Sequence, residues 1–342
     1  MKRMIGLTAA VCALSMLAGC SGDTASESTI GVAIYKYDDS FMTGVRNQIQ
    51  KSAVDGEYKV DIVDSENKQT VQNDKVDLFL TKKYPALAIN PVDRTAAGTL
   101  IDKCKNANTP VVFVNREPLA EDMKKWDKVY YVGAKAEQSG EIQGKMIAAW
   151  WEKNKASGGD RNGNGLLDYV MLTGEIGHQD ATLRTEYAIK TLTQEGVRVS
   201  KLAEQTANWN RNEGQSVLET ILNAGTNAKD VDVVFANNDD MALGAIEALK
   251  AAGFFGDDKS KYVPVVGVDA TGAGKEAIKN GTMYGTAYND AINQGKAAYE
   301  LAAILAKGET PGADNFEYQV TDGRYVWIDY KEVTRENVDS LQ

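Results

Sequence analysis

Short apolar runs typical of strands alternate with amphipathic runs typical of helices along most of this 342-residue chain. This alternation indicates parallel sheets covered by helices on both faces and joined by right-handed crossovers. The expected strands are Ile30–Tyr35, Lys59–Val63, Ala86–Ile89, Val111–Val114, Val129–Val132, Tyr169–Leu172, Val197–Ala203, Val231–Ala236, Val265–Val268, Tyr284–Tyr288 and Tyr325–Ile328. The clearest helical runs are Phe41–Val54, Arg94–Asn106, Glu137–Lys153, Asn210–Leu222 and Met241–Ala252.

Two of these strands end in the same way, and the length of the chain predicts about two domains. Ala86–Ile89 runs into Asn90, and Val231–Ala236 runs into Asn237 and Asn238, with a helix start after each. Taken singly, such asparagines are helix caps or Asx-turns. Together they indicate two similar α/β lobes whose asparagines face a shared cleft.

The only histidine of the chain lies in Gly177–Arg184, between the strand Tyr169–Leu172 and a helical run that continues through Ile189. This position places His178, Asp180 and Arg184 at the carboxyl end of a strand. Ligands of open α/β sheets bind at such ends.

The first 20 residues are typical of an export signal. Lys2 and Arg3 precede the apolar run Met4–Met16, and small residues lead to Cys20. An ordinary secretory signal is one interpretation. The polar segment that follows favours the other, a bacterial lipoprotein signal (residues 1–19) cut before a lipidated Cys20, with residues 20–29 as a flexible tether.

Removal of Lys2 and Arg3 changes the formal charge from −10 to −12, because 48 acidic residues then face 36 basic ones. This balance argues against nucleic-acid binding, which needs basic patches. With Cys20 lipidated and Cys12 removed, Cys104 stands alone, so no intrachain disulfide is expected.

Six segments with distinctive polar residues follow one another along the chain: Tyr35–Phe41, Leu87–Asn90, Gly174–Asp180, Ala236–Asp239, Gly267–Ala270 and Tyr288–Asp290. In this order they resemble the galactose/glucose-binding protein family, the sugar receptors of ABC importers. The resemblance extends from about Ile30 nearly to the C-terminus.

The resemblance implies a type I periplasmic binding protein fold whose two lobes close on one hexose, D-galactose or D-glucose. It implies three hinge crossings, expected near Val114–Arg116, Tyr288–Asn289 and Thr321–Arg324. The N-terminal lobe would comprise residues 30–114 and 289–322, and the C-terminal lobe residues 115–288 and 323–342. The implied partners are an ABC permease and, by family analogy alone, a chemoreceptor. We expect a monomer held outside the cytoplasm by its lipid.

The resemblance also implies the sugar contacts. Phe41 and Trp209 match the two aromatic residues that enclose the pyranose ring. The residues that match its hydrogen-bonding partners are Asp39, Asn90, His178, Asp180, Arg184, Asn238, Asp269 and Asn289.

These residue types suit a hexose on chemical grounds. Carboxylates accept bonds from neighbouring hydroxyls, Arg184 and His178 donate, and amides do both. Local alternatives remain for each: Phe41 as core, Asp269 as a helix cap, His178 as a structural histidine, and Arg184 paired with Asp180 one helical turn away.

A second cluster, Asp160–Asp168, follows the spacing of an EF-hand calcium loop, with glycine at its sixth position. The usual glutamate at position twelve is absent, because Met171 stands there. In the resembled family a distant acid replaces it, and the matching residue here is Asp232. The expected ligands of a structural calcium ion are Asp160, Asn162, Asn164, Leu166 through its carbonyl, Asp168 and Asp232; a glycine-rich polar turn is the alternative.

We expect no enzymatic activity. A glycosidase needs an acid and a second carboxylate on either side of a scissile bond, whereas these acids alternate with Arg184, His178 and amides. A sugar-responsive repressor would carry a helix-turn-helix where this chain has its export signal.

Overall fold

A computed structural model describes residues 28–224, 230–255 and 261–341. The expected signal peptide, Cys20 and most of the tether lie outside these residues. Thr29, the last residue of the expected tether, already belongs to the first strand.

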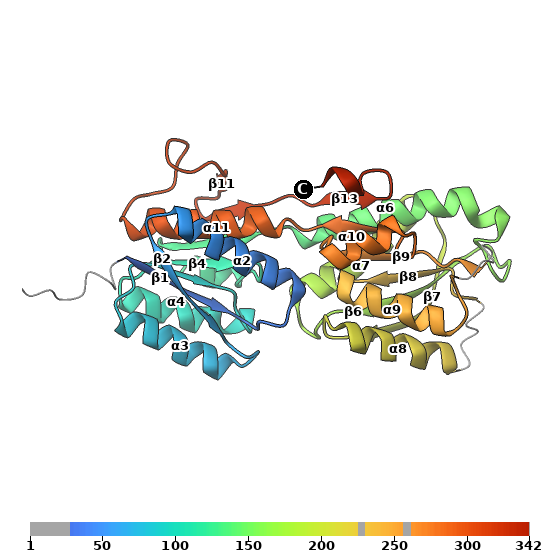
Figure 1. The fold of residues 1–342 in the computed structure, drawn as a ribbon, viewed down its shortest axis with the longest axis horizontal. Coiled ribbons are helices and arrows are strands. Elements are labelled where there is room, and N and C mark those ends of the chain that lie inside the picture. Colours follow the sequence, from blue (N-terminus) through green and yellow to red (C-terminus); the bar gives the residue numbers. More distant parts are fainter. Residues whose placement is uncertain (1–27, 225–229, 256–260, 342) are drawn as a thin grey trace, which may run out of the picture.

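The described residues form two α/β lobes side by side, as expected (Figure 1). The first lobe contains a seven-stranded sheet in the order β11-β12-β5-β4-β3-β1-β2. Its strands are β1 (Thr29–Ile34), β2 (Lys59–Asp64), β3 (Leu87–Ile89), β4 (Val111–Val114), β5 (Val129–Gly133), β11 (Val320–Thr321) and β12 (Tyr325–Trp327). Its pairings are parallel except for β11 with β12.

The second lobe contains a six-stranded sheet in the order β13-β10-β9-β8-β6-β7, in which only β13 pairs antiparallel. Its strands are β6 (Leu167–Thr173), β7 (Val199–Thr206), β8 (Val233–Ala236), β9 (Val265–Val268), β10 (Gly285–Tyr288) and β13 (Lys331–Thr334). The short strands β11 and β13 lie at the edges of the two sheets and were not among the expected strands.

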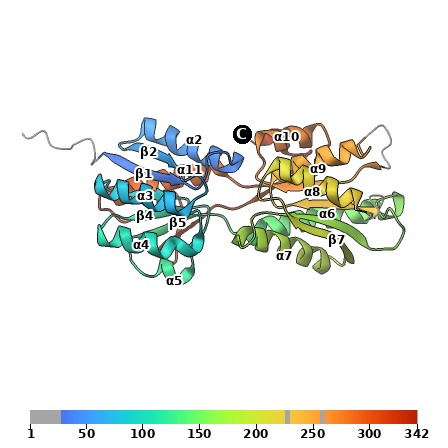
Figure 2. The same cartoon turned by 90° about the horizontal axis from the view of Figure 1, so that it is seen from below.

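Helices cover both faces of each sheet (Figures 1 and 2). In the first lobe they are α2 (Ser40–Asp55), α3 (Gln69–Thr81), α4 (Ala97–Asn106), α5 (Ala120–Met123) and α11 (Ala291–Ala306). In the second lobe they are α6 (Ala136–Asn154), α7 (Gln179–Gln194), α8 (Arg211–Asn223), α9 (Asp239–Ala251) and α10 (Gly272–Lys279). No helix in the described residues is both long and apolar enough to cross a bilayer.

Each sheet separates two hydrophobic cores. In the first lobe, α2 and α11 bury Val45, Ile49 and Leu301 on one face, and α3 and α4 bury Phe79 and Leu100 on the other. Burial on both faces explains why these strands read as continuous apolar runs.

The chain crosses between the lobes three times, but two crossings differ from their expected positions. The middle crossing follows Tyr288, as predicted. The first follows Gly133 rather than Val114, because β5 pairs with β4 in the first sheet. The third follows Trp327 rather than Thr321, because β12 pairs with β5. The expected lobe boundaries at 114/115 and 322/323 are therefore wrong: residues 115–133 and 323–327 belong to the first lobe.

Candidate functional site

A cavity lies between the lobes, where the carboxyl ends of both sets of strands meet. Its lining includes nine of the ten predicted sugar-binding residues, together with four that were not predicted. The predicted ones are Asp39, Phe41, His178, Asp180, Arg184, Trp209, Asn238, Asp269 and Asn289. The additional ones are Tyr35, Met42, Asn115 and Arg116.

Arg184 lies at the centre of the second lobe's wall, with a side chain that is only 5% exposed. Its Nη2 donates to Asp180 Oδ2 at 3.1 Å and to the Tyr330 hydroxyl at 3.0 Å, and its Nη1 donates to the Asn237 carbonyl at 2.6 Å. Its Nε is buried without a partner. The predicted pair with Asp180 is thus present, and two of the five N–H groups of the guanidinium, on Nε and on Nη1, remain available.

Burial sets the charges of this wall. It raises the pKa of Asp180 and raises that of Asp269 well above its usual range, while Arg184 opposes both shifts. Burial disfavours the charge of Arg184, but Tyr330, Asp180 and Asp269 raise its pKa overall. The guanidinium and the carboxylates therefore depend on one another for compensation.

His178 is neutral and has a defined tautomer. It caps α7, and its Nδ1 accepts the backbone N–H of Asp180 at 3.1 Å. Burial and the charges of Arg116, Arg184 and Arg94 hold its pKa well below the usual value. A neutral imidazole that accepts at Nδ1 carries its proton on Nε2, so His178 can donate to a ligand.

Trp209 forms the aromatic face of the second lobe. Asn208 and Trp209 both have positive φ, 48° and 63°, which turns the indole ring toward the cleft. A Cβ on Gly174 would lie 2.1 Å from this ring, so only glycine fits beneath it. The indole Nε1 is buried without a partner and forms a second available donor.

The first lobe contributes Asp39 and two aromatic rings. Asp39 caps α2 through the backbone N–H of Met42 at 2.7 Å, and it accepts the Tyr35 hydroxyl at 2.6 Å. Phe41 lies in the first turn of α2 and belongs both to the core and to the cavity lining. Phe41 is therefore both a core residue and part of the cavity lining.

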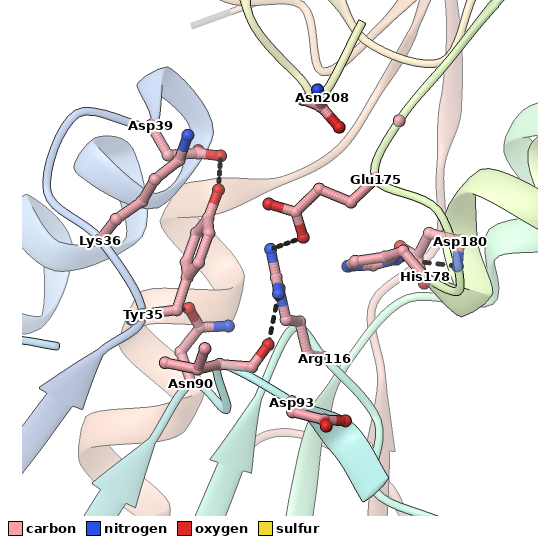
Figure 3. A network of polar contacts seen from close by, with 12 residues as sticks. Tyr35, Lys36, Asp39, Asn90, Asp93, Arg116, Glu175, His178, Asp180 and Asn208 are labelled. Carbon is pink, nitrogen blue, oxygen red and sulfur yellow. Dashed lines mark hydrogen bonds and ion pairs between the residues drawn. The ribbon is translucent and has the colours of Figure 1, made fainter. Parts of the chain in front are cut away.

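Arg116, after β4, joins the two walls (Figure 3). Its guanidinium lies 3.8 Å from the centre of the Tyr35 ring, and its Nη1 donates to the Val92 carbonyl. Its Nη2 donates to Glu175 of the second lobe at 3.0 Å. A neighbouring bond, from Gln179 Nε2 to Glu117 at 3.0 Å, also bridges the lobes.

Asn90 is fully buried and does not line the cavity. Its Oδ1 accepts the Tyr35 N–H at 3.2 Å, and its Nδ2 donates to the Val114 carbonyl at 2.9 Å and to Asn115 Oδ1 at 3.4 Å. Both N–H groups of this amide are thus occupied and its side chain is away from the cavity lining, so a sugar contact from Asn90 stays a prediction.

The last three predicted residues lie at the ends of β8, β9 and β10. Asn238 caps α9 and donates to the Trp209 carbonyl at 3.3 Å. Asp269 has φ 118° and does not cap α10, because Thr271 does so. Asn289 donates to Asp269 Oδ1 at 3.3 Å and accepts Gln294 Nε2 at 2.6 Å.

The loop predicted to bind calcium is held together by its own side chains. Asn162 and Asn164 both donate to Asp168 Oδ2 at 2.8 Å, and Asp232 accepts the backbone N–H groups of Arg161 and Asp168. Within the described ranges, no group of three His, Cys, Asp or Glu side chains is arranged to hold a metal ion. Amide and backbone oxygens would therefore have to complete a coordination shell.

Two observations nevertheless fit a cation in this loop. Asp160 Oδ1 is buried without a partner. Burial, together with the charges of Asp168 and Asp160, raises the pKa of Asp232 to about 7, although two backbone N–H groups oppose the shift. A cluster of this kind has acceptor oxygens in excess of donors.

The cleft as a whole suits a small polyhydroxylated ring. It offers charged acceptors, charged and neutral donors, and aromatic faces on both lobes. Two buried donors without partners, Arg184 Nε and Trp209 Nε1, require acceptors such as hydroxyl oxygens.

Comparison with known proteins agrees with this geometry. Residues 30–310 match the model of the periplasmic binding protein domain family. The chain belongs to this family. It is 40% identical over 339 residues to the D-galactose/methyl-galactoside binding periplasmic protein MglB of Haemophilus influenzae, covering 99% of this chain and 98% of that protein.

More distant relatives bind other polyols. The ribose import binding protein RbsB of Escherichia coli is 29% identical over 90% of this chain and 94% of its own length. An ABC transporter solute binding protein from Bacillus halodurans, solved with bound myo-inositol, is 30% identical. It has a TM-score of 0.76 and covers 94% of this chain and 98% of that one. The chain is therefore a sugar-binding receptor of the type that serves ABC importers, and the predicted type I fold is confirmed.

Proposed function

We propose that this receptor binds a single hexose, D-galactose or D-glucose, between its lobes and delivers it to an ABC permease. The observation that carries the proposal is the lining of the cleft. Charged acceptors, available donors and the rings of Phe41 and Trp209 surround one cavity between the lobes. The 40% identity to a galactose receptor supports the choice of sugar.

The mechanism follows from the division of the site between two lobes. A sugar that contacts Asp39 and Phe41 on one side and Asp180, Arg184 and Trp209 on the other binds best when the cleft is closed. Only this difference in affinity moves the equilibrium toward closure. The closed form is then what the permease recognises.

Isothermal titration calorimetry of the chain without residues 1–19, with Cys20→Ser to prevent lipidation, tests the proposal. We expect one-to-one binding of D-galactose or D-glucose and little heat with ribose. The variant Trp209→Ala should abolish the signal, whereas Trp126→Ala, far from the cavity lining, should preserve it. Binding of ribose alone, or of no sugar, would contradict the proposal.

We further propose that the loop 160–168 and Asp232 hold a structural calcium ion, with oxygens from Asp160, Asn162, Asn164, Asp168 and the Leu166 carbonyl. The ion would supply positive charge to the buried acids. Calorimetric unfolding should show a higher Tm in calcium than in EDTA, and Asp160→Asn should reduce this difference. An equal Tm in both conditions would contradict the site.

We also propose that Cys20 carries a lipid that anchors the receptor outside the cytoplasm. The small residues before Cys20 and the polar segment after it support this. In cell fractionation, Cys20→Ser should move the protein from the membrane to the soluble fraction, while Cys12→Ser should not. We infer a monomer without enzymatic activity; coupling to a chemoreceptor is a second possible output, supported only by family analogy.

A further inference from the structure

Tyr330 lies directly after the third crossing between the lobes. Ile328, two residues earlier, still donates its N–H to Gly133 at the end of β5 in the first lobe. The N–H of Tyr330 itself donates to Gln138 Oε1 on α6 at 3.1 Å, and β13 of the second lobe begins at Lys331. Tyr330 is thus the point at which the returning chain attaches to the second lobe.

The side chain of Tyr330 extends from this crossing to the sugar site. Its ring packs with Val268 and Ala287 and is 6% exposed. Its hydroxyl accepts Arg184 Nη2 at 3.0 Å. Tyr330 does not line the cavity, so it contacts the guanidinium from behind.

This contact completes the set of bonds that orients Arg184. Nη1 is held by the Asn237 carbonyl, and Nη2 is shared between Asp180 and Tyr330. In a planar guanidinium whose Nη atoms are both held by hydrogen bonds, the direction of the Nε–H is fixed as well. Nε is buried without a partner beside the cavity.

Asp180 alone provides a weaker constraint. It lies one helical turn from Arg184 on α7, so the pair can move together with the helix. Tyr330 belongs to a different element and fixes the guanidinium relative to the sheet. Loss of its hydroxyl would also leave part of a buried charged donor without an acceptor, which is costly.

We infer that Tyr330 is a positioning residue for sugar binding, which orients Arg184 from the third crossing so that Nε faces the ligand. This inference rests on the proposed binding of a hexose in the cleft. Tyr330 would then affect the affinity for the sugar through Arg184, without contacting the sugar itself.

The variant Tyr330→Phe removes only the hydroxyl. We expect it to raise the Kd for D-galactose about tenfold, the lower end of the effect of a hydrogen bond to a charged group. Tyr299→Phe is the matched control, because Tyr299 is equally buried and its hydroxyl donates to the Tyr58 carbonyl far from the cleft. The control should lower the Tm without changing the Kd. An unchanged Kd in Tyr330→Phe overturns the inference.

A double-mutant cycle with Arg184→Lys distinguishes positioning from direct contact. If Tyr330 acts through Arg184, its substitution adds little to the loss caused by Arg184→Lys. Additive losses overturn the inference. Absence of hexose binding by the unaltered protein is a separate result, which overturns the proposed function and this inference with it.

Nitrogen NMR of Arg184 gives a readout without sugar. In the unaltered protein, rotation of the guanidinium should be slow because both Nη atoms are bonded. It should be faster in Tyr330→Phe and unchanged in Tyr299→Phe. Equal rotation in all three proteins overturns the inference.

Discussion

The two walls of the cleft are built differently. The wall of the second lobe contains a buried guanidinium, buried carboxylates and a neutral histidine that contact one another or the backbone. The wall of the first lobe has one carboxylate, Asp39, and aromatic rings. Its guanidinium, on Arg116, is stacked on Tyr35 and bonded to the opposite lobe.

This difference indicates a division of labour. Buried charges that satisfy one another hold fixed directions before a ligand arrives, and such preorganised groups select among hydroxyl patterns. Stacked rings and an ion pair that bridges the lobes contribute when the cleft is closed. We therefore expect the second lobe to determine which sugar binds and the first lobe to determine how firmly the cleft closes.

The sharpest test compares one aspartate from each wall. Asp180→Ala removes a proposed ligand contact and also a partner of buried Arg184, so we expect the Kd to rise at least about 100-fold, or ~3 kcal/mol. Asp39→Ala should raise it about tenfold. Asp38→Ala, whose side chain is 80% exposed, should leave it unchanged. Equal losses at Asp180 and Asp39, measured by calorimetry, would remove the distinction between the walls.

A smaller effect is expected from Gly174→Ala. The added methyl group would press on the Trp209 ring and tilt it, which should raise the Kd about tenfold and shift the tryptophan fluorescence of the bound form. Gly312→Ala, whose Cβ would meet nothing within 4 Å, is the control. Unchanged affinity in Gly174→Ala would show that the second wall is less rigid than its packing indicates.

The ion pair between the lobes should have a modest effect. Glu175→Gln keeps the shape of the side chain but removes its charge, so closure should weaken and the Kd should rise about threefold, within the range for partly exposed pairs. The dependence of the Kd on salt should also decrease. Glu152→Gln, in an exposed pair with Lys155, should change neither quantity. A tighter Kd in Glu175→Gln would mean that the pair holds the cleft against the ligand.

The last prediction concerns stability and pH rather than affinity for the sugar. Asp239, behind the second wall, is buried, and burial raises its pKa to about 7 although Thr286 and Thr271 donate to it. The folded protein therefore keeps a proton that the unfolded chain releases above about pH 4. The contribution of Asp239 to the free energy of unfolding should therefore be most favourable at low pH and should fall as the pH rises from about 4 toward 7.

Asp239→Asn should remove this slope, since an amide of the same shape does not titrate. Its Tm relative to the unaltered protein should increase between pH 5 and pH 8. The exposed control Asp38→Asn should show no such trend. A parallel pH dependence in Asp239→Asn and the unaltered protein would place the titration elsewhere.

Much of the fold could be predicted because its strands are buried on both faces and read as apolar runs. The edge strands Val320–Thr321 and Lys331–Thr334 escaped prediction, since they are short and partly exposed. The lobe boundaries were wrong for a different reason. Local sequence identifies Val129–Val132 and Tyr325–Ile328 as strands, but the partners of a strand depend on distant residues.

The site shows the same limit. Residues at strand ends could be found from their position and chemistry, and His178 stood out as a unique residue. Arg116, Glu175 and Tyr330 gave no such signal, because their importance comes from contacts with residues far away in the sequence. Asn90 shows the converse: its position at a strand end predicts exposure to the cleft, yet the backbone of neighbouring strands occupies its amide.

The late return of the chain to the first lobe has a consequence for biosynthesis. Helix α11 packs on α2, and β12 lies beside β5, so the first lobe lacks part of its core and one side of its sheet until residues near Trp327 have been made. The second lobe likewise waits for β13. Neither sheet is complete before these late segments have been made, and contacts between residues so far apart in the sequence predict slow folding. That delay lengthens the interval in which the polypeptide is still unfolded, the state in which a protein destined for the far side of a membrane can be threaded through it.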